Sequence, residues 1–450
     1  MMRKPIFVCA MLLLASTAWP QYGGYKEPDD DKPAQRYANM PDEAVPYRRF
    51  TKPYYDWFIR TDTLEYNGAA EKRPDGDVSQ LKEIAIGFFS PVENNPEMIF
   101  GIPALHGAQL AIDEANARGG YHGKPYALKL HNESARWGAS SAELVKMLFD
   151  ENCWGMVGCV DGQNCHILLR TSLKLEVPMV DVGTTDPTVT ETRIQWLMHD
   201  FIDDRQQGYT LADYVFKNLK LKRIGIIRTQ TRYARIGVEK FSDQARRMGR
   251  QPVLEVKFER GDKDFTRQLR MLNGARIEGV VIWGEAAEAG LILKQMRAMG
   301  MKQQVFGGSR MAYPQLIEIA GPAAEGMVMT TALDPTRQDP KWLAFREAYR
   351  KRFNEVPIDY AAYAYDGMNI LTSTIEKVGL NRGRIMAALR DYQMKTYEGV
   401  TGKAFFDHTL NNISPLHMAR VKDGKFEYWL APRQGGHEGL GSTAGGRGGR

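Results

Sequence analysis

Short runs of apolar residues alternate with amphipathic segments from Glu83 onward. The short runs are bounded by Gly, Pro or Ser, as buried strands are, and the segments between them repeat apolar residues with a helical period. In the first half of this region the pattern predicts a helix from Leu105 to near Gly119, further helices at 140–150 and 167–175, and strands at 84–89, 126–131, 154–157 and 178–182.

The same alternation is then repeated. It predicts helices at 207–217, 237–248, 264–273 and 286–299, and strands at 223–228, 253–258, 279–283 and 305–307. Later segments predict helices at 340–353 and 360–378, and strands at 397–406, 416–421 and 426–430 with a hairpin turn at Asp423-Gly424. Alternating strands and helices are typical of parallel sheets covered by helices on both faces. Two successive sets predict an α/β protein with two similar lobes.

The start of the chain has the pattern of a secretory signal peptide. Arg3 and Lys4 precede an apolar run at 6–15, and small residues follow it. The run is shorter than the roughly 20 apolar residues that span a bilayer, so we expect residues 1–18 to be removed on export to the periplasm. An uncleaved anchor is the alternative. Cys9 lacks the small neighbours of a lipoprotein cysteine, so no lipid anchor is predicted.

Two other segments lack sustained periodicity. Residues 19–80 are rich in Pro, Asp, Tyr and Gly, and we expect a largely irregular N-terminal extension. Its aromatic cluster at 54–58 is either a short helix docked on the main body or a partner-binding segment. Residues 434–450 are Gly-rich and predicted to be disordered.

The composition is that of a soluble globular protein, with 43% hydrophobic and 25% charged residues. The net charge of +6 is small for 450 residues, and the basic residues do not gather into one patch with interleaved aromatic residues. Nucleic-acid binding requires such a patch, so the charge pattern argues against this class of function and indicates a mixed solvated surface.

Three cysteines follow the predicted cleavage site, at Cys153, Cys159 and Cys165, and His166 adjoins the last. In an oxidising compartment one pair could be bridged, leaving one thiol over. Buried free thiols and a metal site are the alternatives, although the spacing is not the short Cys-x-x-Cys of zinc sites. The sequence leaves these three interpretations open.

Known catalytic patterns are missing from the sequence. It has no nucleophile elbow, no phosphate-binding Gly-rich loop followed by Lys-Ser/Thr, no paired-His metal helix and no dinucleotide fingerprint. We therefore predict that the protein is not an enzyme and that it needs neither a cofactor nor a metal.

The loops after the predicted strands are rich in small and polar residues. In open parallel sheets, ligands lie at the carboxyl ends of strands, where Gly exposes backbone N–H groups and helix N-termini favour anions. Together with Thr hydroxyls, these groups suit a carboxylate, although tight strand–helix turns need the same residues. The loops are 89–91, which includes Ser90, and 160–164, 183–187, 229–235, 284–285 and 307–310.

At these residues the chain resembles the type I periplasmic binding proteins of the leucine/isoleucine/valine-binding family, from about Glu83 to about Leu430. The segments that carry the resemblance, in the family's order, are GFFSPV, HGAQLAIDEANARGG, EVPMVDVGTTDPTVT, DFTRQLRMLNGARIEGVVIWG, AAEGMVM and YAAYAYDGMNIL. The family's first-lobe cysteine pair is not reproduced.

The resemblance implies two Rossmann-like lobes joined by three hinge crossings, near 199–203, 330–334 and 399–406, with the ligand in the cleft between them. Hinge motion closes such lobes around the ligand. The implied partners are the permease and ATPase of an ABC importer. The implied lobe limits are 83–201 with 334–400 for the first lobe and 202–331 with 404–431 for the second.

The resemblance also implies individual roles. Thr185 stands where the family has a Thr that binds the ligand carboxylate, and Gly183 where a backbone group helps. Gly162 replaces a Ser that binds the same carboxylate, and the neighbouring Gln163 is the expected substitute. Tyr233 matches a Tyr on the second lobe that closes over the ligand.

The largest departure from the family is at Ser309, where amino-acid binders have an acidic residue for the α-ammonium group. Glu285 or Asp161 could replace this acid, because a buried ammonium without a carboxylate costs several kcal/mol. If Arg310 faces inward, it favours a second acidic group on an organic or aromatic acid; a surface position is the alternative. The complete candidate ligand-binding set is Ser90, Gly162, Gln163, Gly183, Thr184, Thr185, Tyr233, Glu285, Ser309 and Arg310.

The function expected from these features is capture of an amino acid or related small carboxylate as the periplasmic solute-binding component of an ABC importer. One rival is a ligand-sensing receptor module for a membrane signalling partner, which the long N-terminal extension favours. A second rival is an enzyme or redox-associated protein that uses Cys153, Cys159, Cys165 and His166.

Overall fold

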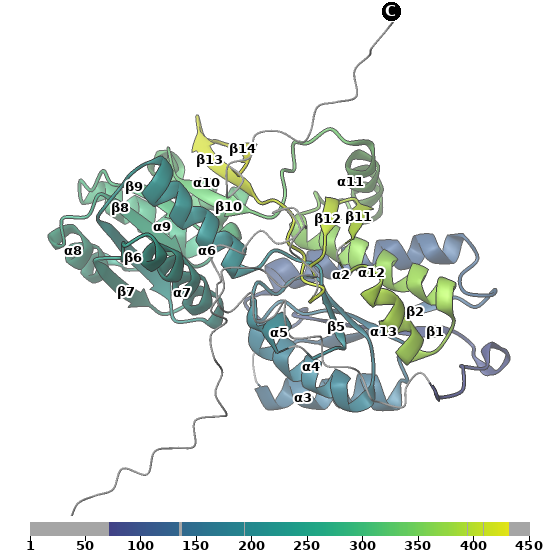
Figure 1. Ribbon diagram of the computed structural model, residues 1–450. Coiled ribbons are helices and arrows are strands. Elements are labelled where there is room, and N and C mark those ends of the chain that lie inside the picture. The colour runs from purple at the N-terminus through teal and green to yellow at the C-terminus, as the bar shows by residue number, and fades with distance from the viewer. Residues whose placement is uncertain (1–71, 135–136, 193, 394, 408, 432–450) are drawn as a thin grey trace, which may run out of the picture.

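Two helix-covered sheets make up most of the computed structural model (Figure 1). The structure describes residues 72–134, 137–192, 194–393, 395–407 and 409–431. The predictions for the signal peptide, Cys9, the aromatic cluster at 54–58 and the Gly-rich tail lie outside the described residues. The described end of the N-terminal extension, from residue 72 to 80, contains a single 3-10 turn, η3 (Val78–Gln80).

The first sheet is parallel and has the order β2-β1-β3-β4-β5. Alternate side chains of β1, an interior strand, point to opposite faces: Ile84, Ile86 and Phe88 pack under one helical layer, and Ala85 and Phe89 under the other. Both faces are buried, which is why the strand is a continuous apolar run. The strands are β1 (Ile84–Ser90), β2 (Tyr126–Asn132), β3 (Met156–Gly158), β4 (Met179–Asp181) and β5 (Leu197–His199).

Helices from distant parts of the chain cover this sheet. One face carries α2 (Met98–Ala117) and α12 (Asp359–Val378), with α13 (Arg382–Arg390) beside α12. The other face carries α3 (Trp137–Val145), its π-helical continuation η4 (Lys146–Asp150) and α4 (Gly162–Leu175). The short α5 (Thr188–Glu191) follows β4.

The second sheet has the order β14-β13-β10-β9-β8-β6-β7, and all its pairings are parallel except those of β13, which runs antiparallel to both β10 and β14. The predicted hairpin turn is confirmed, because Asp423 and Gly424 both have positive φ, as a type I′ turn requires. The strands are β6 (Ile224–Thr229), β7 (Leu254–Phe258), β8 (Gly279–Trp283), β9 (Gln304–Gly307), β10 (Val328–Thr331), β13 (His417–Lys422) and β14 (Lys425–Leu430).

The helices of the second lobe also form two layers. One contains α6 (Asp204–Asp213), its π-helical continuation η5 (Tyr214–Asn218) and α7 (Arg232–Arg247). The other contains α8 (Thr266–Gly274), α9 (Ala286–Ala298) and α10 (Pro314–Ala320), followed by the 3-10 turn η7 (Gly321–Ala324).

The chain passes between the sheets three times: between β5 and α6, between β10 and α11 (Pro340–Phe353), and between β12 (Gly402–Phe405) and β13. The predicted fold class, α/β with two lobes and three crossings, is therefore confirmed. The exact lobe limits stay a prediction, which is supported by the strands that belong to each sheet.

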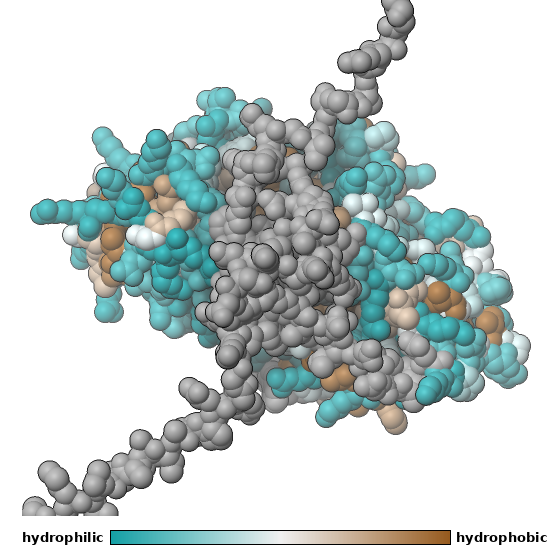
Figure 2. All heavy atoms as spheres, viewed as in Figure 1, coloured by the Kyte–Doolittle hydropathy of each residue, from teal (hydrophilic) through white to brown (hydrophobic). Residues whose placement is uncertain are grey.

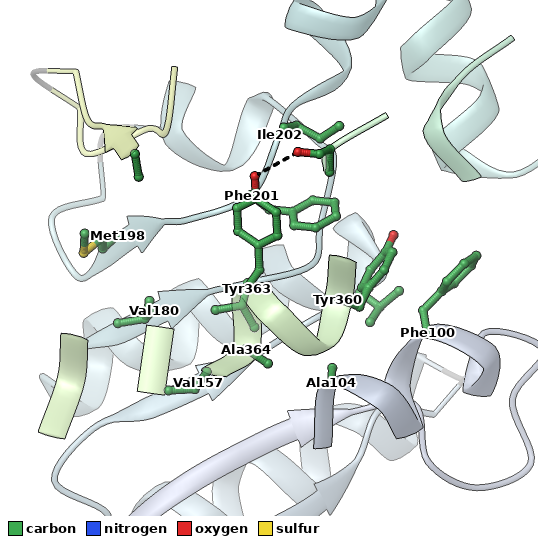
Figure 3. Packing of buried hydrophobic residues seen from close by; sticks show 14 of the residues in the cluster. Phe100, Ala104, Val157, Val180, Met198, Phe201, Ile202, Tyr360, Tyr363 and Ala364 are labelled. Atoms are coloured by element: carbon green, nitrogen blue, oxygen red, sulfur yellow. Dashed lines mark hydrogen bonds between the residues drawn. The ribbon is translucent and has the colours of Figure 1, made fainter. Parts of the chain in front are cut away.

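Helix α12 contacts the first two crossings and the hairpin turn that precedes the third. Figure 3 shows Tyr360 and Tyr363 facing Phe201 on the first, with ring centroids 4.8 and 4.9 Å apart. The Tyr363 hydroxyl donates to the backbone oxygen of Ala332 on the second, 3.4 Å away. Asp366 accepts the N–H groups of Val400 and Thr401 at 2.9 and 2.8 Å, just before the third. A single helix thus contacts two of the segments about which the lobes would rotate, together with the turn that leads to the third.

Several sequence-based boundaries differ from the structure. The single strand predicted at 397–406 is wrong, because β11 (Thr396–Gly399) and β12 form a hairpin whose turn Asp366 holds. Helices α4 and α7 begin earlier than predicted, since Asp161 and Thr231 cap their first turns. Elements β5, β10, α10 and α13 were not predicted.

The visible face of the described residues is mainly hydrophilic, with small separate apolar areas (Figure 2). Among the described residues, no helix combines the length and apolar character needed to cross a bilayer.

Close packing of α2 on α12 depends on Gly107. A Cβ atom there would lie 2.0 Å from the backbone oxygen of Ala361. We expect Gly107→Ala to lower the free energy of unfolding by about 1–3 kcal/mol, because a backbone atom must move. Gly274→Ala, on α8 with nothing within 4 Å of its Cβ, is the control and should be neutral or stabilise by up to about 1 kcal/mol. Urea unfolding of both variants tests this; equal stabilities would contradict it.

Candidate functional site

The carboxyl ends of parallel strands from the two lobes face each other, and side chains from the loops beyond them meet. Arg310, after β9, contacts Glu97, after β1. Nine of the ten predicted site residues are buried, whereas Gln163 is exposed. The structure therefore brings most of the predicted set to the space between the lobes, as expected for open parallel sheets.

A chain of hydrogen bonds joins the two loops that carry Thr185 and Ser309. The Thr185 hydroxyl donates to Asp204 at 2.8 Å, and the Gln207 side-chain amide donates to the other oxygen of Asp204 at 3.3 Å. The Gln207 oxygen accepts from the Ser309 backbone N–H at 2.9 Å and from the Thr330 hydroxyl at 3.0 Å. Sequence reasoning missed Asp204 and Gln207, although they adjoin the predicted first crossing.

The loop after β4 is organised around a buried carboxyl group. Asp181 accepts the backbone N–H groups of Gly183 and Thr184, both at 3.2 Å. Burial raises the pKa of Asp181 to about 6, although His199, 3.5 Å away, opposes this. The Gly183 backbone group, expected from the resemblance to help bind a ligand carboxylate, thus donates to a carboxyl at the end of β4, as does the N–H group of Thr184. The direct ligand roles of Gly183 and Thr185 stay a prediction.

Gly162 and Gln163 belong to the first turn of α4 and not to a loop. The Asp161 side chain accepts hydrogen bonds from the backbone N–H groups of Gln163 and Asn164, at 3.0 and 3.1 Å. A Cβ on Gly162 would lie 2.7 Å from the Asp186 side chain. Asp186 therefore packs closely where the family's Ser side chain would lie. The exposed Gln163 side chain does not join the buried residues.

Ser90 also has an internal partner. Its hydroxyl donates to the backbone oxygen of Gly101 at 3.3 Å. This bond joins the end of β1 to the first turns of α2, and the Ser90 side chain is fully buried. The structure therefore assigns Ser90 a local packing role, while its predicted ligand contact stays a prediction.

Two arginines and two glutamates form a network that we call the ionic quartet: Glu97, Arg260, Glu285 and Arg310. Arg260 is partly exposed, and the other three are buried. One oxygen of Glu97 lies 2.8 Å from Arg260 and 3.0 Å from Arg310. One oxygen of Glu285 lies 2.8 Å from Arg260 and 3.5 Å from Arg310. Glu97 belongs to the first lobe and the other three belong to the second, so the quartet crosses the gap between them.

The quartet decides one open question from the sequence. Arg310 is 1% exposed, so it faces inward. Burial raises the pKa of Glu285 against the opposing charges of Arg260 and Arg310. Burial by itself would also raise the pKa of Glu97, but the charges of Arg310 and Arg260 outweigh this effect and lower the pKa. Sequence reasoning missed Glu97 and Arg260. Arg260 follows the predicted strand at 253–258, but neither residue lies in the loops selected for their small and polar residues.

Aromatic side chains frame Arg310. Its guanidinium lies 4.4 Å from the ring centre of Tyr233 and 5.0 Å from that of Phe100, distances at which cations are attracted to ring faces. Phe100 stacks on Tyr360 with ring centroids 4.7 Å apart, as Figure 3 shows. The hydroxyls of Tyr233 and Tyr360 and the indole N–H of Trp283 are buried and have no hydrogen-bond partner within the described chain.

Two further contacts cross the gap. Arg232, at the start of α7, pairs with Asp186 at 2.6 Å and donates to the Thr188 hydroxyl at 3.1 Å. The Tyr313 hydroxyl donates to Asp359 at 2.7 Å. With the ionic quartet, these contacts hold the lobes in a closed arrangement.

The three described cysteines are buried free thiols. Burial raises the pKa of Cys153 and of Cys159 to about 12, and that of Cys165 well above its ordinary value. Because the thiolate is the reactive form and the metal ligand, these groups are unsuited to redox chemistry at neutral pH. Within the described ranges no cluster of His, Cys, Asp and Glu side chains could hold a metal ion.

Comparisons with known proteins agree on one family. A family model described as "Periplasmic binding protein" matches residues 83–425. The "Leu/Ile/Val-binding protein homolog 2" of Brucella abortus is 29% identical over 361 residues, which are 78% of this chain and 94% of that protein. The "Leu/Ile/Val-binding protein BraC3" of Rhizobium johnstonii is 26% identical over 300 residues, 66% of this chain and 80% of that protein.

Solved structures agree in fold. The branched-chain amino acid substrate-binding protein LivJ of Streptococcus pneumoniae, in complex with isoleucine, has a TM-score of 0.70 and 26% identity, covering 78% of this chain and 99% of that one. A solute-binding protein of R. palustris, in complex with benzoate, has a TM-score of 0.69 and 15% identity, covering 78% of this chain and 97% of that one. The second likeness shows the fold alone.

Buried carboxyl groups predict a pH dependence of stability. Burial raises the pKa of Asp181, Asp359 and Asp366 to about 6, from an ordinary value of 3.8. Between these values the folded chain holds more protons than the unfolded chain, so stability falls as the pH rises from about 4 to about 6. Each group contributes up to about 1.4 kcal/mol per pH unit.

Urea unfolding between pH 4 and pH 7.5 measures this slope. Asp359→Asn is the informative variant, because an amide oxygen can still accept from Tyr313 but does not titrate. We expect a shallower slope in the variant than in the parent protein. A stability that rises through this window would show that these carboxyls ionise normally in the folded state.

Proposed function

This chain belongs to the periplasmic binding protein family, and on that premise we propose that it is the substrate-binding component of an ABC importer. It captures an amino acid or related small carboxylate between its lobes and presents it to a membrane permease, which an ATPase drives. As a member of this family the protein is a binding protein and not an enzyme.

The observation that carries this proposal is the meeting of charged and aromatic side chains from both lobes at the strand ends. Glu97 of the first lobe lies against Arg260 and Arg310 of the second, with Tyr233 and Phe100 around them. Such contacts exist only when the lobes are close together. A ligand that contacts both lobes therefore shifts the population toward the closed form.

Export is part of the proposal. The family indicates an extracytoplasmic location, and the apolar run at 6–15 after Arg3 and Lys4 supports delivery by a cleaved signal peptide. The relatives named as Leu/Ile/Val-binding proteins favour an amino acid, whereas the neutral Ser309 favours a different carboxylate.

A sensor module is the second candidate, and the N-terminal extension favours it. The described end of the extension is bonded to the first lobe. Asp75 pairs with Arg384 at 2.5 Å, and Asn381 donates to the Arg73 backbone oxygen at 3.0 Å. Affinity capture from membranes of the source cell separates the two: recovery of an ABC permease supports import, and recovery of a signalling receptor without one supports sensing.

Ligand binding is tested by thermal shift of the purified protein with panels of amino and organic acids, after native mass spectrometry for bound molecules. A ligand that binds only the folded state stabilises it and so raises the melting temperature. At a concentration of 100 times its Kd the stabilisation is about 2.7 kcal/mol. A panel without any shift would contradict the proposed function.

Thr185→Ala should weaken any observed binding by at least about tenfold, or 1.4 kcal/mol. It removes a hydroxyl at the end of β4 together with its bond to Asp204, on which Gln207 and Ser309 depend. Thr336→Ala, on an exposed turn where the hydroxyl bonds only Asp334, is the control. Equal binding by both variants would remove Thr185 from the site.

A further inference from the structure

Arg310 is fixed at the strand ends, between the two lobes. It belongs to the 3-10 turn η6 (Ser309–Met311), in which all three residues are buried. One guanidinium nitrogen lies 3.0 Å from Glu97, and another donates to the Val160 backbone oxygen at 3.2 Å. In the closed arrangement Arg310 is buried, so a ligand bound beside it would have to be compatible with its charge.

The ionic quartet carries no surplus negative charge for a ligand ammonium. Its two carboxylates face two guanidinium groups, and each carboxylate is paired with both. An ammonium placed here would give the quartet a net positive charge beside a fixed arginine. An anion would instead add a partner for two guanidinium groups that already share their carboxylates.

The other carboxyl groups near the quartet already have hydrogen-bond donors within the chain. Each receives hydrogen bonds from backbone N–H groups or side chains, so none requires a ligand cation. Glu133 accepts from Val160 and Asp161, Asp161 from Gln163 and Asn164, Asp204 from Thr185 and Gln207, and Asp359 from Tyr313 and Tyr360.

The buried groups around Arg310 that lack partners are mainly donors. Buried polar atoms are normally hydrogen-bonded, so a cluster of unpartnered ones indicates a missing ligand. The unpartnered acceptors are second oxygens of Glu97 and Glu285, whose first oxygens each meet two arginines. Within the described chain, the unpartnered donors are the Tyr233 and Tyr360 hydroxyls, the Trp283 indole N–H, and the Nε groups of Arg260 and Arg310.

We propose that Arg310 and the unpartnered donors of Tyr233, Tyr360 and Trp283 select an organic carboxylate that carries no α-ammonium group. This inference rests on the proposed function and names its ligand class. The Arg310 guanidinium takes the place that an amino acid's ammonium would occupy, and the ligand carboxylate receives hydrogen bonds from the donors. The rings of Phe100, Tyr233, Tyr360 and Trp283 favour a branched or aromatic tail.

Matched acids test the inference directly. Isothermal titration of the full-length processed protein compares 4-methyl-2-oxopentanoate with leucine, and phenylpyruvate with phenylalanine. Each pair shares its tail and carboxylate and differs only in a 2-oxo or 2-ammonium group. We expect the oxo acid to bind at least tenfold more tightly in at least one pair.

The outcomes separate this inference from the proposed function. Tighter or equal binding of the amino acids would overturn the inference and leave solute capture intact. Failure of all four compounds to bind would count against both. Binding of an oxo acid in the micromolar range, with its amino acid weaker by tenfold or more, supports both.

Tyr233→Phe provides a variant that should fold normally, because the hydroxyl it removes has no partner in the described chain. We expect roughly a ten- to hundredfold loss of oxo-acid affinity, the value of one hydrogen bond to a charged group, with an unchanged melting temperature. Tyr349→Phe removes a hydroxyl on α11, away from the strand ends, and is the matched control. Equal oxo-acid affinity in both variants would contradict the role of Tyr233.

Arg310→Gln tests the charge itself. The quartet then has two carboxylates and one guanidinium, so we expect the oxo-acid preference to shrink at least tenfold or to reverse toward the amino acid. Arg297→Gln is the control, since Arg297 contacts only backbone oxygens at the end of α9. An unchanged preference in a folded Arg310→Gln protein overturns the inference; if that variant does not fold, the titrations of the parent protein and of Tyr233→Phe decide.

Discussion

The buried contact between Arg310 and Glu97 is the interaction on which the relation of the two lobes depends. It joins a turn after β9 to the segment before α2, and water is excluded from both groups. A buried ion pair contributes little net stability, but removing one partner leaves an uncompensated charge that costs about 3–5 kcal/mol. The pair therefore acts less as a source of stability than as a constraint: the closed arrangement is acceptable only when these two groups, or a ligand in their place, are correctly paired.

Helix α12 provides the fixed frame for this contact. Tyr360 begins the helix beside Phe100, one of the rings that frame Arg310, while Tyr363 and Asp366 contact the crossing segments. The binding region and the hinge therefore share one rigid element. Movement about the crossings is transmitted to the aromatic rings without an intervening flexible loop, which is how a closing motion can respond to a small ligand.

The sequence predicted the architecture well because it is encoded in local periodicity. The continuous apolar strands and amphipathic helices could be read directly, as could the hairpin turn at Asp423-Gly424. The three-residue β5 is too short to have a readable period. The site was only partly predictable: Arg310 and Glu285 lie in strand-end loops rich in small and polar residues. Arg260 follows β7 in a loop without that pattern, and Glu97 and Asp204 are brought to the site by tertiary packing. That the loop N–H groups would serve Asp181 could not be inferred from residue types, since the same pattern suits an external anion.

The order of segments along the chain constrains how the molecule can form. The helix that covers the first sheet, α12, is synthesised only after the strands β6 to β10 of the second lobe, and that lobe in turn lacks β13 and β14 until residue 430. Neither lobe has all its layers while the other is absent. Folding therefore cannot proceed lobe by lobe from the N-terminus, as it does in chains of consecutive domains. It must wait for contacts between residues hundreds of positions apart, which are slow to form.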